Sequence, residues 1–73
     1  MTHGSKTFII KLNDTTYTTD NFKRANQHLE TILLFLGLLN SVALAQALMV
    51  KIFFECDTIS MTINDDTLEI RKI

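Results

Sequence analysis

The chain has 73 residues, a formal net charge of −1, two histidines and one cysteine. A domain this small has only a marginal core, and such domains commonly add a disulfide, a metal ion or a partner subunit. The single Cys56 excludes an internal disulfide, and the histidines and cysteine lack zinc-ligand spacing, so oligomerisation is the support that remains.

Charged residues are spread along the chain without a long basic or acidic block. This pattern argues against a nucleic-acid partner, because such proteins usually present a basic patch or stripe. A lone free thiol is typical of a reducing compartment. The first residues contain no apolar run of the kind that forms a secretory signal. We therefore expect a cytoplasmic protein.

Residues 7–19 predict a β-hairpin. Apolar and polar side chains alternate in its first half, which is the period of a half-buried strand. A two-residue turn at residues 13–14 would place Ile10 opposite Tyr17.

The longest apolar stretch is residues 31–50, in which sixteen of twenty positions are apolar or glycine and none is charged. A helix is predicted to start near residues 18–20, where hydroxyl and carboxylate side chains suit a helix N-terminus. If this helix continued to residue 50, it would be about 45 Å long, which exceeds the diameter of a compact domain of this size. Either the helix breaks between Gly37 and Ser41, or a second copy of the chain covers the excess, and the two solutions are compatible.

The last third of the chain predicts a three-stranded antiparallel meander. Apolar residues alternate in each strand, beginning with Ile52, Phe54 and Cys56. Turns at residues 57–58 and 65–66 would pair Ile63 with Leu68.

These elements together predict an α+β fold, a two-layer sandwich of order β-β-α(-α)-β-β-β. The N-terminal hairpin and the C-terminal meander form one antiparallel sheet, which packs on one long or broken central helix. Residues 1–6 are expected to be a disordered tail, and residues 7–73 a single domain.

No motif in the sequence indicates an enzyme, a cofactor or a metal site. His28 and Glu30 fall on the polar side of the predicted helix, where we expect solvent. The aspartates coincide with predicted turns, where Asp is favoured for local backbone reasons; they are Asp14, Asp57, Asp65 and Asp66.

The helical stretch offers more large apolar side chains than one sheet face can cover. This excess predicts a homodimer that binds another protein as a regulator, inhibitor or adaptor, a style of small protein familiar from phages and mobile elements. The expected dimer interface is Leu34, Phe35, Leu38 and Val42. The expected partner surface is Ile9 and Phe53, which would point away from the core.

A membrane protein is the alternative interpretation. Residues 32–50 are nineteen positions without a charge, long enough for one spanning helix. Three polar side chains interrupt this stretch, which weakens that interpretation, and they are Asn40, Ser41 and Gln46.

Overall fold

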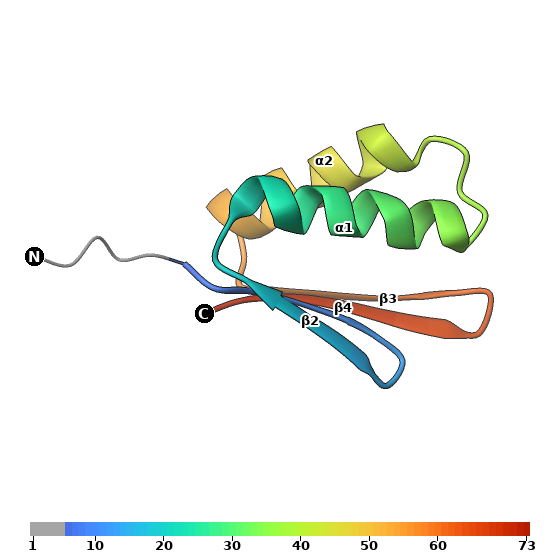
Figure 1. The fold of residues 1–73 in the computed structure, drawn as a ribbon, viewed down its shortest axis with the longest axis horizontal. Coiled ribbons are helices and arrows are strands. Elements are labelled where there is room, and N and C mark those ends of the chain that lie inside the picture. Colours follow the sequence, from blue (N-terminus) through green and yellow to red (C-terminus); the bar gives the residue numbers. More distant parts are fainter. Residues whose placement is uncertain (1–5) are drawn as a thin grey trace, which may run out of the picture.

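The computed structural model describes residues 6–73 as an antiparallel sheet with two helices above it (Figure 1). The elements are β1 (Phe8–Leu12), β2 (Thr15–Thr19), α1 (Phe22–Phe35), α2 (Ser41–Phe54), β3 (Thr58–Ile63) and β4 (Asp66–Lys72). This order confirms the predicted two-layer α+β fold. Of the tail predicted for residues 1–6, residues 1–5 lie outside the described part of the chain.

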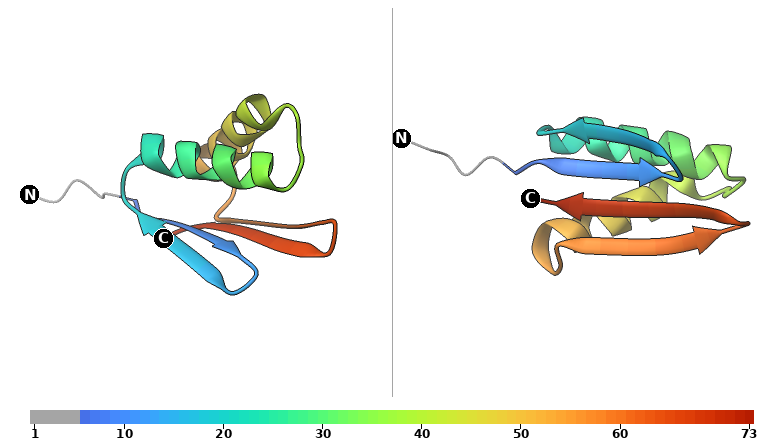
Figure 2. Two further views of the ribbon diagram at one scale, coloured as in Figure 1. Left: turned by 45° about the vertical axis from the view of Figure 1, so that its right-hand side comes forward. Right: turned by 90° about the horizontal axis from the view of Figure 1, so that it is seen from below.

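The strand order is β2-β1-β4-β3, so the first and last strands pair at the centre of the sheet (Figure 2). Ile10 lies opposite Tyr17 in β2 and opposite Ile70 in β4. The first of these pairs confirms the predicted hairpin register. Asn13 sits in the hairpin turn with φ 54°, a left-handed conformation that Asn tolerates better than most residues.

The apolar stretch breaks between two helices, as one of the two predicted solutions requires. The N–H of Gly37 donates to the Leu34 carbonyl at 3.0 Å, and the N–H of Leu38 donates to the Leu33 carbonyl at 3.0 Å. With Gly37 at φ 90°, these bonds form the left-handed helix ending known as the Schellman motif. Asn40 stands at the N-cap of α2, but its side chain makes no capping hydrogen bond.

The break divides residues 32–50, the stretch of the membrane alternative, between α1 and α2. Each helix has 14 residues. Within residues 6–73, neither helix is long and apolar enough to cross a bilayer.

The strand predicted at residues 52–56 is wrong, because α2 continues to Phe54. The buried side chains Ala45, Met49 and Ile52 recur at helical spacing and pack on the sheet. Apolar residues at three alternating positions are compatible with a strand and with a helix. Here the packing of the helix outweighs the β preference of Ile and Phe. The predicted meander is therefore a hairpin, and the sheet reaches four strands because β4 pairs with β1.

The register of this second hairpin also differs from the prediction. The turn lies at Asn64 and Asp65, with φ of 49° and 71°, so Met61 rather than Ile63 pairs with Leu68. Two consecutive left-handed residues favour Asn over Asp at the first position. A shift of two residues keeps every side chain on its predicted face, since strand side chains alternate with period two.

The core lies between the two layers. Its buried apolar side chains are Phe8, Ile10, Ala25, Leu29, Ile32, Leu33, Leu36, Ala45, Met49, Ile52, Leu68 and Ile70. No described helix covers the other face of the sheet, which is polar (Figure 1). Its exposed side chains are Lys11, Thr16, Thr18, Thr58, Ser60, Thr62, Thr67 and Arg71.

Candidate functional site

Large apolar side chains are exposed where α1 turns into α2 and along α2. We call this set the apolar patch, and its members are Leu34, Phe35, Leu39, Val42, Val50 and Phe54. Leu39 is 97% exposed, Phe35 80% and Phe54 74%. Large apolar side chains exposed in this number are typical of a protein interaction site.

The patch follows from the composition of α2. A helix lying on a sheet buries one stripe, and α2 buries Ser41, Ala45, Met49 and Ile52. Its remaining surface contains only one charged residue, Lys51. The outer side of α2 therefore has apolar side chains in contact with water, which costs free energy until a partner covers them.

Three of the four residues expected at a dimer interface are exposed in the structure. Leu34, Phe35 and Val42 are exposed and belong to the patch. Leu38 is half-buried against the core, so it offers less surface to a partner.

The sequence did not single out Leu39, Val50 or Phe54 for the patch. Phe54 belongs to the strand predicted at residues 52–56, which does not form. Leu39 and Val50 were not distinguished from their apolar neighbours, because which side of a helix stays exposed depends on how it packs.

The two residues expected at a partner surface lie on different faces of the molecule. Ile9 is half-buried on the open face of the sheet, level with Thr18 and Arg71. Phe53 is half-buried between the layers, with its ring centroid 6.5 Å from that of Phe8 and 5.6 Å from that of Phe22. They therefore do not form one continuous surface.

Lys6 adds a charged group to this aromatic cluster. Its ammonium lies 3.9 Å from the centre of the Phe53 ring, within the range of a cation–π contact. Phe53 is thus contacted from several sides rather than presented to a partner.

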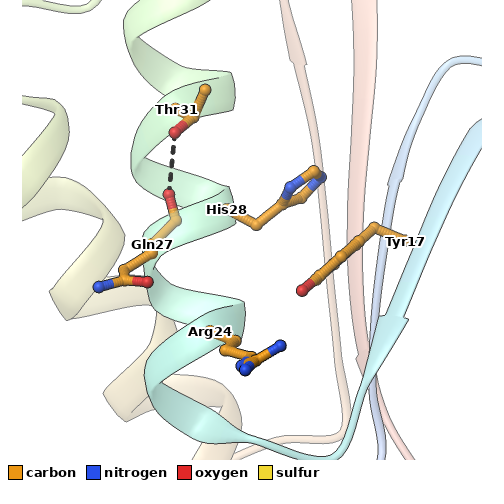
Figure 3. Close-up of a pocket in the computed structure, with 5 residues that line it drawn as sticks. All are labelled: Tyr17, Arg24, Gln27, His28 and Thr31. Carbon is orange, nitrogen blue, oxygen red and sulfur yellow. Dashed lines mark hydrogen bonds between the residues drawn. The ribbon is translucent and has the colours of Figure 1, made fainter.

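A polar hollow of about 410 Å³ lies between α1 and β2 (Figure 3). It is lined by Tyr17, Arg24, Gln27, His28 and Thr31. The rings of Tyr17 and His28 stack with centroids 3.9 Å apart. His28 is therefore half-buried rather than solvated as predicted, and burial lowers its pKa below the ordinary value of 6.5.

The polar groups of the hollow do not converge on one point. Figure 3 shows the Tyr17 hydroxyl directed toward α1 near Arg24, whereas the Gln27 side chain points away from Tyr17. Thr31 donates its hydroxyl to the Gln27 carbonyl at 3.1 Å. The Thr31 hydroxyl is therefore bonded to the backbone rather than to His28, whereas covalent catalysis requires a nucleophile hydrogen-bonded to its base.

No protein family, curated protein or solved structure matches this chain. Within residues 6–73, no group of three or more side chains is placed to hold a metal ion. Two of the aspartates make local contacts: Asp57 lies 3.5 Å from the Lys72 ammonium, and Asp66 accepts a hydrogen bond from Asn13.

Proposed function

We propose that the protein is a small, non-enzymatic protein-binding module that acts as a homodimer in the cytoplasm. The observation that carries this proposal is the apolar patch, which is exposed, uncharged and confined to the helical side of the molecule. The single free thiol supports a reducing compartment.

A second copy of the chain is a suitable cover for the patch. A standard interface buries about 800 Å² on each partner. One phenylalanine can bury roughly 150–250 Å², and Phe35 and Phe54 are both largely exposed. Together with the aliphatic members, these rings supply much of the area that a two-fold interface needs.

A dimer formed through the helices would leave the sheet free for another protein. The open face carries Ile9 among threonine and serine side chains, with Lys11 and Arg71 as its exposed charges. The edge strands β2 and β3 each have one free side, to which an extended segment of a partner can add a strand.

The dimer is tested by light scattering coupled to size exclusion. We expect a mass of about twice the 8.3 kDa chain, and a monomer for the double variant Leu34→Glu with Val42→Glu. Both side chains are exposed, so the variant should keep its fold, which circular dichroism verifies.

The matched control is Thr16→Glu, which adds a carboxylate on the open face of the sheet. This variant should remain a dimer. A monomeric parent protein, or a double variant that stays fully dimeric, would contradict the assignment of the patch to self-association.

A further inference from the structure

We infer that β3, rather than β2, is the edge at which a partner protein binds. An extended segment of the partner pairs antiparallel with β3 as a fifth strand and carries a Lys or Arg beside Asp65. This inference rests on the proposed protein-binding function and names its surface and the chemistry of the partner. β3 is the outer strand on the side of the sheet opposite β2, and it pairs with β4 alone among the described strands (Figure 2).

The free side of β3 presents the backbone groups of every second residue. The N–H of Lys72 donates to the Asp57 carbonyl at 2.9 Å, and this bond fixes which residues point toward β4. Because antiparallel strands bond at alternate residues, the odd-numbered residues of β3 bond to β4 and the even-numbered residues point their groups outward. These outward groups have no backbone partner within residues 6–73, and they belong to Thr58, Ser60 and Thr62. A row of free N–H and C=O groups at this spacing is complementary to an extended backbone.

β3 also lacks the features that usually protect an edge strand. Its sequence, TISMTI, has neither a charge nor a proline. Its six residues pair with β4 in one continuous register, without a bulge. Natural proteins use charges, proline and bulges to prevent strand addition at an edge, so their absence from β3 leaves this edge open.

An added strand would cover apolar side chains that the core covers only in part. The inward residues of β3 are half-buried at the margin of the core, and they are Ile59, Met61 and Ile63. α2 contacts β3 and β4, and its Phe53 marks the flank that meets α1, with a ring centroid 5.6 Å from that of Phe22. Leu44 and Leu48 lie on the other flank, toward β3, and are also half-buried. Apolar side chains on the inward face of the partner strand would pack beside them.

The second edge strand does not offer this combination. The inward residues of β2 are two threonines and Tyr17, whose ring is stacked on His28 of α1. β2 has five residues, and by the same alternation only Thr16 and Thr18 point backbone groups outward. Free hydrogen-bonding groups and half-buried apolar side chains therefore coincide at β3.

The charges at one end of the sheet determine the end of the partner segment. Both hairpin turns lie at the end of the sheet away from the C-terminus, and they carry Asp14 and Asp65, with Asp66 at the start of β4 (Figure 1). The cation of this region, Lys11, lies on the open face opposite Glu69. A Lys or Arg at the N-terminal end of an antiparallel segment would lie beside Asp65, with complementary charge.

Hydrogen exchange tests the edge residue by residue. The probe is the acetylated peptide Lys-Val-Thr-Val-Thr-Val-Thr, which alternates apolar and polar side chains behind one N-terminal charge. We expect a saturating concentration of peptide to slow exchange of the outward β3 amides by about tenfold or more. The outward amides of β2, those of Thr16 and Thr18, should exchange as before.

Ser60→Pro is the matching variant. It removes an outward N–H that β4 does not use, so the sheet should be retained, which circular dichroism verifies. The dissociation constant of the fluorescein-labelled peptide, measured by anisotropy, should rise by about tenfold or more. Thr16→Pro makes the same change on β2 and should bind the peptide as the parent does. If Ser60→Pro does not fold, hydrogen exchange on the parent decides alone.

Asp65→Asn tests the charge. Asn tolerates the left-handed conformation of this position, so the turn should be retained. The variant should bind the peptide several-fold more weakly, but it should bind a peptide with Gln in place of Lys as well as the parent does. Equal binding of the Lys peptide by variant and parent would overturn the assignment of a basic end to the partner.

The other outcomes are distinct. A peptide that does not bind, or that slows the β2 amides instead, would overturn the inference. Slow exchange of the β3 amides before peptide is added, lost on dilution, would show that a second copy occupies β3 and would also overturn it. Light scattering on the same protein separates the two proposals. A dimer that does not bind the peptide leaves the proposed homodimer standing, whereas a monomer that binds it at β3 removes the homodimer alone.

Discussion

Tyr17 and His28 stack their rings with planes 17° apart, and this contact joins the edge of the sheet to the helical layer. Tyr17 belongs to β2, which has one neighbour in the sheet, and His28 belongs to α1. The imidazole is therefore held where part of it leaves water, and this partial burial makes the protonation of His28 unfavourable in the folded chain.

The stability of the protein should consequently depend on the protonation of His28. Since the pKa of His28 is lowered in the folded state, the unfolded chain binds this proton more readily. The free energy of unfolding is expected to decrease as the pH falls from about 7 to about 5.5, through the ordinary histidine range. Urea unfolding of the parent and of His28→Phe at both pH values measures this decrease in the free energy of unfolding, which should be smaller for the variant. Equal losses would show that His28 does not contribute.

Asn13 ties the two hairpins together, and removing its side chain should destabilise the sheet. Its Nδ2 donates to Asp66 at 2.9 Å, and its Oδ1 accepts from the N–H of Thr67 at 3.0 Å. Asn13→Gly loses these bonds but tolerates the positive φ, so we expect a loss of about 1 kcal/mol. Asn13→Ala also strains the turn, and the loss should be about 2–3 kcal/mol. Equal losses in urea unfolding would contradict a left-handed turn.

Gly37 ends α1 with φ 90°, and a β-carbon added there would meet nothing within 4 Å. The cost of Gly37→Ala is therefore conformational rather than steric, and we expect about 1–2 kcal/mol in the free energy of unfolding. Gly37→Asn should cost less, since Asn adopts this conformation more readily. If Ala were the milder replacement, the two helices would not be divided at this residue.

The parts of the fold that the sequence predicts correctly depend on local chemistry. The register of β1 and β2 follows from alternation and a two-residue turn at Asn13, and the helix break follows from the position of Gly37. Residues 52–56 are different, because their alternation is too short to exclude a helix. The contact of Ile52 with the sheet decides their structure, and a contact distant in sequence leaves no local pattern.

The exposure of the residues in the candidate interface is predictable to a similar extent. The excess of apolar side chains over one sheet face indicates an exposed surface, and Leu34, Phe35 and Val42 do lie on it. Its extension to Phe54 depends on where α2 ends. Which side of α2 faces outward depends on how the helix rests on the sheet, and that is a property of the tertiary structure alone.

The last two residues of α2 provide a direct test of this helix. Phe53 packs between the layers, whereas Phe54 is 74% exposed. Phe53→Ala should lower the free energy of unfolding by about 2–3 kcal/mol, somewhat less than a fully buried ring. Phe54→Ala should change it by no more than about 0.5 kcal/mol, when both are made with Leu34→Glu and Val42→Glu so that self-association does not contribute.

Urea unfolding of the two variants compares them directly, with the Leu34→Glu and Val42→Glu double variant alone as the reference. A strand at residues 52–56 would reverse the order, because it would turn Phe54 inward and Phe53 outward. A larger loss of unfolding free energy for Phe54→Ala than for Phe53→Ala would therefore contradict a helix that continues to Phe54. It would also remove Phe54 from the apolar patch, since a side chain that packs in the core is not free to meet a second copy.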